Sequence, residues 1–425
     1  MQTLLCLSIA LFAGLMLSRL AKKVQLPAVT AYLVAGILIG PYLLGAFGVQ
    51  GLGFTSMEEI HTFSIISDVA LGFIAFSIGN EFRLTDLKKI GKQATVIGIF
   101  QAVFTTLLVD AALIGLHFLI PDKFPLEAAI VLGAVASATA PAATLMVVRQ
   151  YKAKGPVTNI LLPIVALDDA VGLVLFAISF GVAKALMSGQ VDLLSVIVEP
   201  ILEVVLSIGL GAAMGFFFTW AERFFHSRSK RLAMSVAFVL ATVAISMMKF
   251  EIFGIHVAFS SLLACMMLGT IFCNICDFSE ELMDRLDRWT APLFILFFVI
   301  SGAELELSVF GDIIIVLIGV TYIAFRSAGK YFGATLSSKW MKCDPNIIKY
   351  LGITLLPQAG VALGMAIKAK EGLGELGMVV ANITLFAVLV YELVGPFLTK
   401  MALLKAGEIK PEGRTSARKL DSDAK

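Results

Sequence analysis

The sequence predicts an all-α polytopic membrane protein of about 13 transmembrane helices, arranged as inverted-topology repeats with two broken crossing helices. Three observations predict this class: a strongly apolar composition, apolar segments of membrane-spanning length, and a short internal repeat. Of the 425 residues, 59% are hydrophobic and only 15% are charged, whereas a soluble globular protein is about 25% charged. The 36 glycines agree with this class, because small residues let helices pack closely in lipid.

Composition and motifs also limit the classes of ligand. The formal net charge of +2 is too small to indicate a nucleic-acid partner, and no glycine-rich phosphate loop follows a strand pattern. The one Cys-x-x-Cys pair, Cys273 and Cys276, has no second pair and no histidine beside it to complete a zinc site. We therefore expect no cofactor and no enzymatic activity. The apolar composition leads us to expect membrane lipid around the chain.

Apolar segments long enough to cross a bilayer recur along the chain. The first lacks a small-residue cleavage site behind it, which indicates a retained helix. The regions 125–148 and 349–370 are rich in Gly, Ala, Ser and Pro, so we expect broken helices there. Residues 1–404 are expected to form a single transmembrane unit, and residues 405–425 a disordered cytoplasmic tail. The expected spans are 3–20, 27–45, 60–82, 92–119, 126–148, 157–183, 195–221, 232–248, 253–272, 291–309, 312–338, 349–367 and 376–399.

The distribution of lysine and arginine orients the chain. If the N-terminus lies outside, the segments on the inner side hold most of the 33 basic residues. The outer segments then hold only Lys123, Lys184, Lys249, Lys368 and Lys370. Because basic residues collect on the cytoplasmic side, we expect an outside N-terminus, a cytoplasmic C-terminus and an odd number of spans.

A short repeat links the two halves of the chain. A Gly-x-Glu-x-x-Leu pattern occurs at 79–84, where the third span ends, and again at 302–307, where the tenth span ends. A proline interrupts the fifth span within 137–142 and the twelfth within 355–360. In the expected topology the paired spans run in opposite directions. Opposed copies with broken helices at corresponding positions are typical of inverted-repeat transporters, whose binding site lies near the membrane midplane.

Asp168 and Asp169 stand in the middle of the apolar segment at 157–183. Placing one aspartate at the centre of a bilayer helix costs about 2.5–3.5 kcal/mol. Successive helix residues point about 100° apart, so one carboxylate can face a partner helix and the other a water-filled cavity. Burial and mutual repulsion disfavour the ionised forms, so the pair can hold a proton or a small cation. The alternative is a structural polar pair at a helix interface, although intramembrane ionisable residues are functional by default.

Thr139 and Pro141 lie at the first interruption, and Pro357 and Gln358 at the second. Proline cannot extend an ordinary helix cleanly, and irregular backbone at membrane depth is tolerated only beside a cavity or buried protein. The hydroxyl and carbonyl oxygens of Thr139 suit a small hard cation. Two crossing breaks would place opposite helix-dipole ends against each other. A simple kink at Pro141 is the alternative for that site.

Two basic residues, Lys330 and Arg326, lie well inside the eleventh span. Lys330 could reach the interface by extending its side chain, but its central depth favours pairing with an acid. Arg326 lies one helical turn earlier. It could bind the free carbonyls of a broken helix or pair with another acid, and the sequence leaves both open.

Four stretches carry a resemblance to a known family. They are the opening helix at 26–41, Thr139-Ala140-Pro141, the doublet at 168–169, and a lysine followed by an aromatic pair and a glycine at 330–333. With them the chain resembles, over nearly its whole length, the sodium/proton antiporters of the monovalent cation:proton antiporter-2 family. The resemblance implies thirteen helices, and a homodimer in which a core domain moves against a dimerisation domain.

The resemblance also implies roles for single residues. Asp169 would bind the cation, and Asp168 would pair with Lys330 and supply a further Na⁺ ligand, with Thr139 beside them. We expect a core domain that includes 60–183 and 291–370. The scaffold and dimerisation domain would include 1–45, 195–272 and 376–399.

Residues and resemblance together predict a secondary active antiporter. It would exchange protons for Na⁺ or Li⁺, with K⁺ as a further candidate, across the plasma (inner) membrane by alternating access, and the exchange would be electrogenic. One alternative is a sodium-coupled symporter of an organic anion on a related inverted-repeat fold, but the sequence offers no surplus basic residues for such a substrate. Another is a channel, but a protonatable pair bound to a lysine favours coupled exchange.

Overall fold

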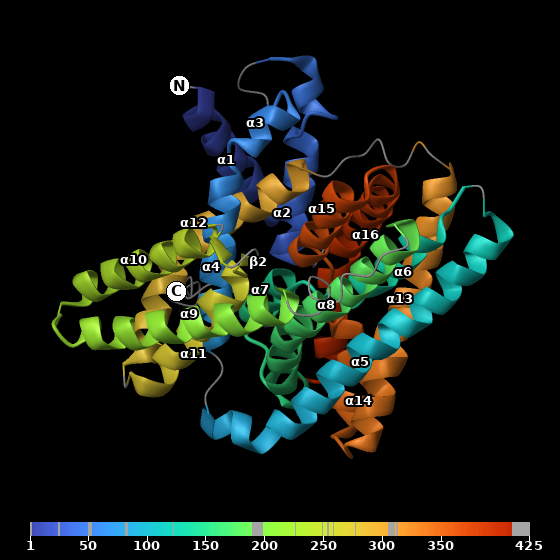
Figure 1. The fold of residues 1–425 in the computed structure, drawn as a ribbon. Coiled ribbons are helices and arrows are strands. Elements are labelled where there is room, and N and C mark those ends of the chain that lie inside the picture. The colour runs from blue at the N-terminus through green and yellow to red at the C-terminus, as the bar shows by residue number, and fades with distance from the viewer. Residues whose placement is uncertain are drawn as a thin grey trace, which may run out of the picture.

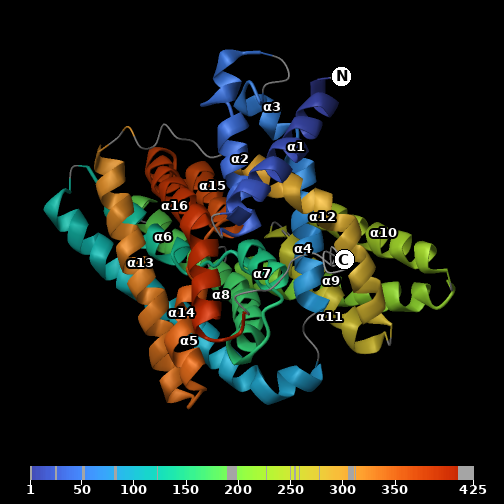
Figure 2. The same ribbon diagram turned by 180° about the vertical axis from the view of Figure 1, so that it is seen from behind.

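Helices make up nearly all of this computed structural model, which is shown from two sides in Figure 1 and Figure 2. The residues that the structure describes are 2–23, 26–49, 53–80, 84–121, 123–188, 199–225, 227–248, 250–252, 255–257, 259–276, 278–304, 311 and 313–409. Before the first break the elements are α1 (Gln2–Lys23), α2 (Ala28–Ile39), the 3-10 helix η1 (Leu44–Phe47), α3 (Met57–His61), α4 (Ser64–Asn80), α5 (Leu84–Leu119) and α6 (Leu126–Val135). Next come α7 (Pro141–Gln150), α8 (Pro156–Ser188), α9 (Glu199–Glu222), α10 (Arg228–Ser246), β1 (Phe250–Ile252), β2 (Ile255–Val257) and α11 (Ser261–Ile275). The last are α12 (Ser279–Ala303), α13 (Ile313–Trp340), α14 (Pro345–Thr354), α15 (Gly360–Leu373) and α16 (Glu375–Lys405).

The lengths and composition of these helices fit a membrane protein. Within the described residues, nine helices are long and apolar enough to cross a membrane, and α4, α6 and α11 are shorter apolar helices. The predicted all-α membrane class is therefore confirmed. The number of about thirteen spans stays a prediction.

Both expected breaks are present. The first separates α6 from α7 at residues 136–140, and the second separates α14 from α15 at residues 355–359. Pro141 is the first residue of α7, where proline is well tolerated because its missing N–H would have no helical partner. The backbone N–H of Ala140 donates to the carbonyl of Pro357 at 2.8 Å. The two interrupted helices therefore meet at their breaks.

The ninth predicted span, at 253–272, starts later than expected. The strands β1 and β2 pair as an antiparallel hairpin ahead of it, and α11 begins only at Ser261. The side chain of Ser260 accepts a hydrogen bond from the N–H of Leu263 at 3.3 Å, which fixes the start of the helix. Mean hydropathy does not separate an apolar hairpin from the adjoining helix.

The tenth predicted span, at 291–309, starts earlier than expected. α12 begins at Ser279, and its first turns carry charged residues that lie ahead of the predicted span. Leu282, Met283 and Leu286 are buried on one side of these turns, which makes the segment an amphipathic helix. The residues beyond 304 in this predicted span lie outside the described part of the chain until residue 311.

The first residues of the predicted disordered tail, 405–425, are ordered. α16 continues to Lys405, and Glu408 and Ile409 are 8% and 4% exposed. Residues 405–409 are thus folded against the bundle. Residues 410–425 lie outside the described residues.

Clusters of buried apolar side chains divide the helices into two packing groups. One cluster joins α1, α2, α4 and α9–α12, and two others join α5, α6, α8 and α13–α16. Side chains of α7 belong to clusters of both groups, and α8 also contributes to the first. Figure 1 and Figure 2 show the same grouping, with α9, α10 and α11 on one side and α5, α13 and α14 on the other. The predicted division assigned α4 and α12 to the core domain and α16 to the scaffold, whereas the packing groups these three the other way. The division into a moving core and a scaffold stays a prediction.

Candidate functional site at the helix crossing

α8 carries the two aspartates into the interior of the bundle. It packs against α5 and α6 and against the halves α7, α14 and α15 of the broken helices. Asp168 is fully buried and Asp169 is 1% exposed. Both carboxyl groups therefore depend on protein partners or on a bound ion for their stability.

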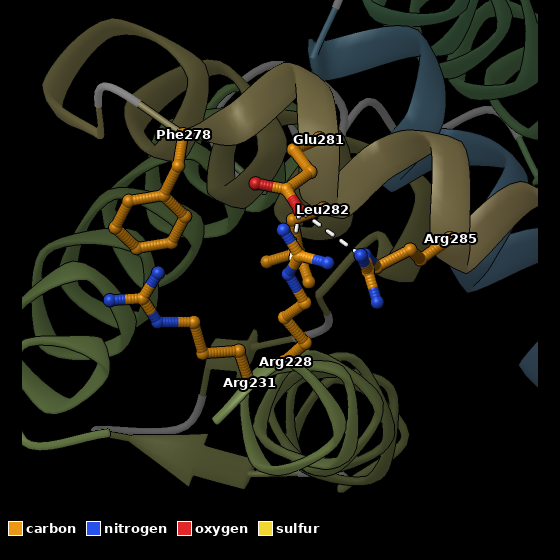
Figure 3. Close-up of a pocket in the computed structure, with 6 residues that line it drawn as sticks. All are labelled: Arg228, Arg231, Phe278, Glu281, Leu282 and Arg285. Atoms are coloured by element: carbon orange, nitrogen blue, oxygen red, sulfur yellow. Dashed lines mark hydrogen bonds and ion pairs between the residues drawn. The ribbon is translucent and has the colours of Figure 1, made fainter. Parts of the chain in front are cut away.

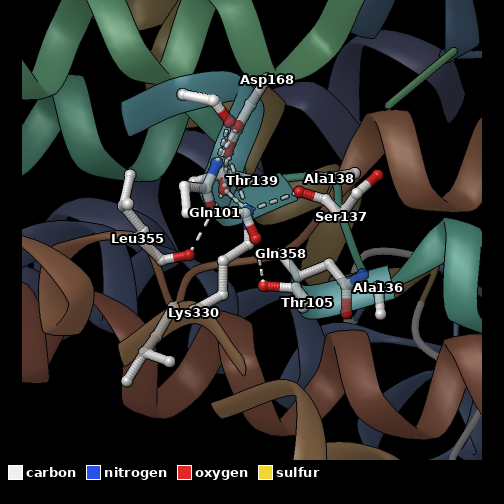
Figure 4. Close-up of polar contacts among 12 residues, drawn as sticks. Gln101, Thr105, Ala136, Ser137, Ala138, Thr139, Asp168, Lys330, Leu355 and Gln358 are labelled. Carbon is white, nitrogen blue, oxygen red and sulfur yellow. Dashed lines mark hydrogen bonds and ion pairs between the residues drawn. The ribbon is translucent and has the colours of Figure 1, made fainter. Parts of the chain in front are cut away.

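Asp168 accepts hydrogen bonds from three side chains, as Figure 4 shows. Its Oδ2 accepts from the Thr139 hydroxyl at 2.6 Å and from Lys330 Nζ at 2.8 Å, and its Oδ1 accepts from Gln101 Nε2. Lys330 is fully buried as well, so the two residues form a buried ion pair. A buried charge is stable only when it is paired and hydrogen-bonded, and Asp168 meets both conditions.

Lys330 on α13 uses all three of its N–H donors in this centre. Besides Asp168, its Nζ donates to the Thr139 hydroxyl at 2.9 Å and to the backbone carbonyl of Ser137. Both of these residues belong to the first break. The lysine therefore connects the ion pair on α8 to the non-helical backbone between α6 and α7, and it does not reach towards the membrane surface.

Gln101 on α5 is a member of this centre that the sequence did not identify. It reaches Asp168 because α5 packs against α8, and α5 also packs closely on α13. A Cβ at Gly333 would lie 3.0 Å from the Cα of Gln101, and one at Gly329 would lie 2.9 Å from the Cα of Thr105. Two small residues four positions apart allow such close helix packing in membranes. The only sequence signal was an uncharged polar residue within an apolar span, which alone says nothing of its partner.

Arg326 binds backbone carbonyls of both breaks. Its Nε donates to Ala136 at 2.9 Å, its Nη1 to Leu356 at 2.7 Å and its Nη2 to Ala138 at 2.6 Å. The guanidinium also lies over the ring of Tyr391, with 4.4 Å between its Cζ and the ring centroid. Of the two roles that the sequence left open, the structure shows the binding of broken-helix carbonyls.

Gln358 and Pro357 complete the contacts between the breaks. The side-chain amide of Gln358 donates to the carbonyl of Val135 and to the hydroxyl of Tyr322, both at 2.9 Å. A Cβ at Gly395 would lie 3.0 Å from the Pro357 ring, so this glycine lets α16 pack directly on the second break. Irregular backbone at membrane depth thus finds its partners within protein, as it must.

Asp169 differs sharply from its neighbour. Among the described residues, neither of its carboxylate oxygens has a hydrogen-bond partner, although both are buried. It lies close enough to Asp168 and Lys330 to interact with both electrostatically. A buried carboxyl group without a partner is stable when it is neutral or when a cation binds it. The structure therefore brings together Asp168, Thr139, Lys330 and the two breaks. Asp169 lies beside them, and both of its carboxylate oxygens are available to bind a proton or a cation.

A second polar region lies away from this centre, between α10 and α12. Figure 3 shows a pocket lined by Arg228, Arg231, Phe278, Glu281, Leu282 and Arg285. Each guanidinium there already has a partner: Arg228 and Arg285 contact Glu281, and Arg231 contacts Glu222 and the ring of Phe278. Among the described residues, no group of three or more His, Cys, Asp or Glu residues is arranged to hold a metal ion.

The helix crossing therefore combines a satisfied ion pair with an unsatisfied carboxylate, inside helices of membrane-spanning length. Broken helices that meet around buried ionisable groups are typical of ion-coupled secondary transporters. The fold and the centre together define this class.

Comparison with known proteins identifies the family. The family model described as "Sodium/hydrogen exchanger, transmembrane" matches residues 7–405, and the chain belongs to this family. The predicted sodium/proton antiporter is thereby confirmed, while its narrower assignment to the antiporter-2 family stays a prediction. The symporter alternative finds no support.

Individual relatives agree with this assignment. The chain is 24% identical over 357 residues to the Na⁺/H⁺ antiporter NhaS4 of Synechocystis, a match that covers 81% of this chain and 83% of that protein. It is 23% identical over 376 residues to the ammonium/H⁺ antiporter subunit AmhT of Alkalihalophilus pseudofirmus, covering 86% and 87%. Two structures of the sodium proton antiporter MjNhaP1 from Methanocaldococcus jannaschii share the fold, with TM-scores of 0.69 and 0.73. Both are 17% identical to this chain and cover 96% of it, and the matches cover 99% and 98% of the solved chains.

Proposed function

We propose that this chain exchanges protons for a monovalent cation by competition at Asp169. The observation that carries the proposal is the pair of buried Asp169 oxygens, which have no hydrogen-bond partner in the part of the chain that the structure describes. An ionised carboxylate is unstable in such surroundings, so Asp169 holds either a proton or a cation. Each event of cation binding then displaces a proton, and each protonation releases the cation.

The groups around Asp169 favour a small hard cation. Carboxylate, hydroxyl and carbonyl oxygens are the ligands that such ions prefer. Asp168 and Thr139 would supply oxygens beside Asp169, once the cation has loosened their bonds to Lys330. Na⁺ or Li⁺ is the proposed substrate, with K⁺ as the further candidate. The names of the relatives add ammonium to the cations worth testing.

Alternating access would move one packing group against the other. We propose that α5, α6, α8 and α13–α16, which surround the centre, move against a scaffold of α1, α2, α4 and α9–α12. This proposed arrangement differs from the predicted domains at α4, α12 and α16. Two such chains would associate as a homodimer through their scaffolds in the plasma (inner) membrane, with the N-terminus outside and the C-terminus in the cytoplasm.

The proposal is tested with purified protein in proteoliposomes that hold an inward-acidic pH gradient. Addition of Na⁺, Li⁺, K⁺ or ammonium, each in a separate sample, should dissipate the gradient for the transported cations only. Liposomes without protein control for leakage, and ammonium also needs this control because free ammonia crosses lipid. A gradient that survives all four cations would refute exchange. Cation flux that continues without proton movement would instead indicate a channel.

A further inference from the structure

The last described residues of the chain contact the start of the helix that carries the ion centre. Glu408 follows α16 and is 8% exposed. Its Oε1 accepts a hydrogen bond from the backbone N–H of Val157 at 2.6 Å. Its Oε2 accepts from the backbone N–H of Thr158 at 2.8 Å and from the Thr158 hydroxyl at 2.5 Å. Val157 and Thr158 belong to the first turn of α8. A side chain that follows α16 therefore binds the start of a helix that lies more than two hundred residues earlier in the sequence.

The positions of these contacts are those of a helix cap. α8 begins at Pro156, so Val157 and Thr158 are its second and third residues, whose N–H groups a capping side chain normally binds. The residue before the helix is Gly155, which has no side chain to serve as a cap. The Glu408 carboxylate supplies the missing acceptor and places a negative charge at the positive end of the helix dipole. A Cβ at Gly155 would lie 2.5 Å from Glu408, so the glycine also makes room for it.

A defined turn holds Glu408 in place. Gly407 has φ +77°, and its N–H donates to the carbonyl of Leu404 at 3.0 Å. The N–H of Glu408 donates to the carbonyl of Leu403, also at 3.0 Å. This pair of bonds is the glycine-terminated end that stops many helices. The next residue, Ile409, packs with Val157 and other residues of α8 in one buried apolar cluster. The turn at Gly407 before it and the packing of Ile409 after it therefore both hold Glu408 against α8.

We propose that Glu408 is a positioning residue for the ion centre. It fixes the start of α8, and the same helix, with Pro163 inside it, leads from the cap to Asp168 and Asp169. Both aspartates must keep their register with the first break, where Thr139 contacts Asp168. Loss of the cap frees the first turn and lets α8 shift along its axis, which weakens cation binding at Asp169. The inference rests on the proposed function, because it assigns Glu408 a role in the affinity of that same site.

The central test compares Glu408→Ala with wild type in the full-length protein. We expect the apparent KM for Na⁺ or Li⁺ to rise at least threefold, while the maximal rate per folded protein stays within twofold. Hydrogen exchange of the Val157 and Thr158 amides should quicken at least tenfold. Glu408→Gln keeps one acceptor oxygen, so its changes should be smaller. Glu412→Ala removes the same charge four residues later and should match wild type in both measurements.

The outcomes separate the possible explanations. Unchanged amide exchange in Glu408→Ala would show that the carboxylate does not cap α8. Faster exchange with an unchanged KM would reduce the cap to a structural role and overturn the proposal. If Glu408→Ala fails to fold, Glu408→Gln and Thr158→Val decide, because each removes only part of the contact and should raise KM in proportion. If wild type transports no cation, the proposed function fails, and the amide exchange still tests the cap by itself.

Discussion

Two adjacent aspartates with the same chemistry have opposite surroundings in this protein. Asp168 accepts hydrogen bonds from Thr139, Lys330 and Gln101, whereas Asp169 accepts none. The rotation of about 100° between successive helix residues separates their side chains and allows this difference. The satisfied aspartate therefore has a structural role in the described state, and the unsatisfied one is available for exchange.

Asp169→Asn should abolish cation/proton exchange without unfolding the protein. Asparagine keeps the shape of aspartate but does not ionise, so it neither carries the proton nor attracts the cation. Removing a buried carboxyl group that has no partner in the structure should leave the melting temperature unchanged or slightly raised. Exchange is measured as pH-gradient dissipation in proteoliposomes, and folding by thermal melting in detergent. Robust exchange by the folded variant would remove Asp169 from the mechanism.

Arg326→Lys should destabilise the protein even though it preserves the charge. The planar guanidinium reaches three carbonyls in two different breaks at once, and a lysine ammonium cannot reproduce this fork. Each buried carbonyl left without a partner costs about 1–3 kcal/mol. We expect a melting temperature several degrees lower, with a parallel loss of transport. A variant as stable as wild type would show that the three bonds do not hold the breaks together.

The sequence predicted part of this centre. Single residues at central depth, such as Asp168 and Lys330, are costly in lipid and are therefore easy to recognise. Gln101 was missed because an uncharged side chain costs less, and its contact with Asp168 depends on how α5 packs against α8. Arg326 had two possible kinds of partner, and only the crossing of the breaks shows which one it binds.

At the scale of elements, α7 connects the ion centre to the other packing group. Its first residues follow the break that holds Thr139. At its other end, Arg149 forms a salt bridge of 2.5 Å with Asp287 of α12, and the side chain of Gln150 accepts a hydrogen bond from the N–H of Ala28, the first residue of α2, at 2.9 Å. Movement of α7 with the centre would have to break both contacts. They therefore form a latch that favours the described arrangement.

Arg149→Ala should shift the protein away from this arrangement. The salt bridge is partly exposed, with side chains 22% and 36% accessible, so its contribution is at most about 1 kcal/mol, or roughly a fivefold change in population. We expect faster labelling of a cysteine placed near the Arg149 end of α7, in a background without the native cysteines. Asp287→Ala should give the same shift, and the double charge reversal Arg149→Asp with Asp287→Arg should restore the original rate. Unchanged labelling in both single variants would show that the contact is no latch.

The sequence predicted the two helix breaks correctly, but it missed the hairpin and the start of α12. Proline flanked by small residues correctly located both breaks. Proline alone would not have done so, because Pro163, Pro292 and Pro396 lie inside α8, α12 and α16. The β1–β2 hairpin and the early start of α12 were missed because a hydropathy window averages over strands and amphipathic turns. The packing of α4, α12 and α16 depends on contacts between distant segments, which no local pattern contains.

At the scale of the whole molecule, the basic residues predict the orientation in the membrane. An impermeant label added to intact cells should reach a tag at the N-terminus and leave a C-terminal tag unlabelled until the membrane is opened. The reason is the retention of lysine and arginine on the cytoplasmic side. A C-terminal tag labelled from outside would reverse the topology. It would also place the Glu408 cap and the Arg149 latch on the outer side.

The charge moved in one transport cycle depends on Lys330. In the described state its ammonium has three acceptors, including Asp168. A cation that arrives at Asp169 repels the ammonium and attracts the Asp168 carboxylate, so both effects weaken the ion pair. Lys330 can then give up its proton. Asp169 and Lys330 would together exchange two protons for one cation, which moves net charge across the membrane.

This scheme predicts that wild-type exchange responds to membrane potential and that Lys330→Gln loses the response. Glutamine carries no proton to release, and Asp168 then holds a proton itself, because a buried carboxylate that has lost its cation partner is strongly destabilised. One cation would exchange for one proton, which moves no net charge. Potassium-diffusion potentials of both signs, imposed on proteoliposomes with valinomycin, should change the rate of Na⁺-driven pH dissipation in wild type only. Wild-type exchange that ignores the potential would rule out electrogenic coupling. A Lys330→Gln variant that still responds would assign the second proton to another group.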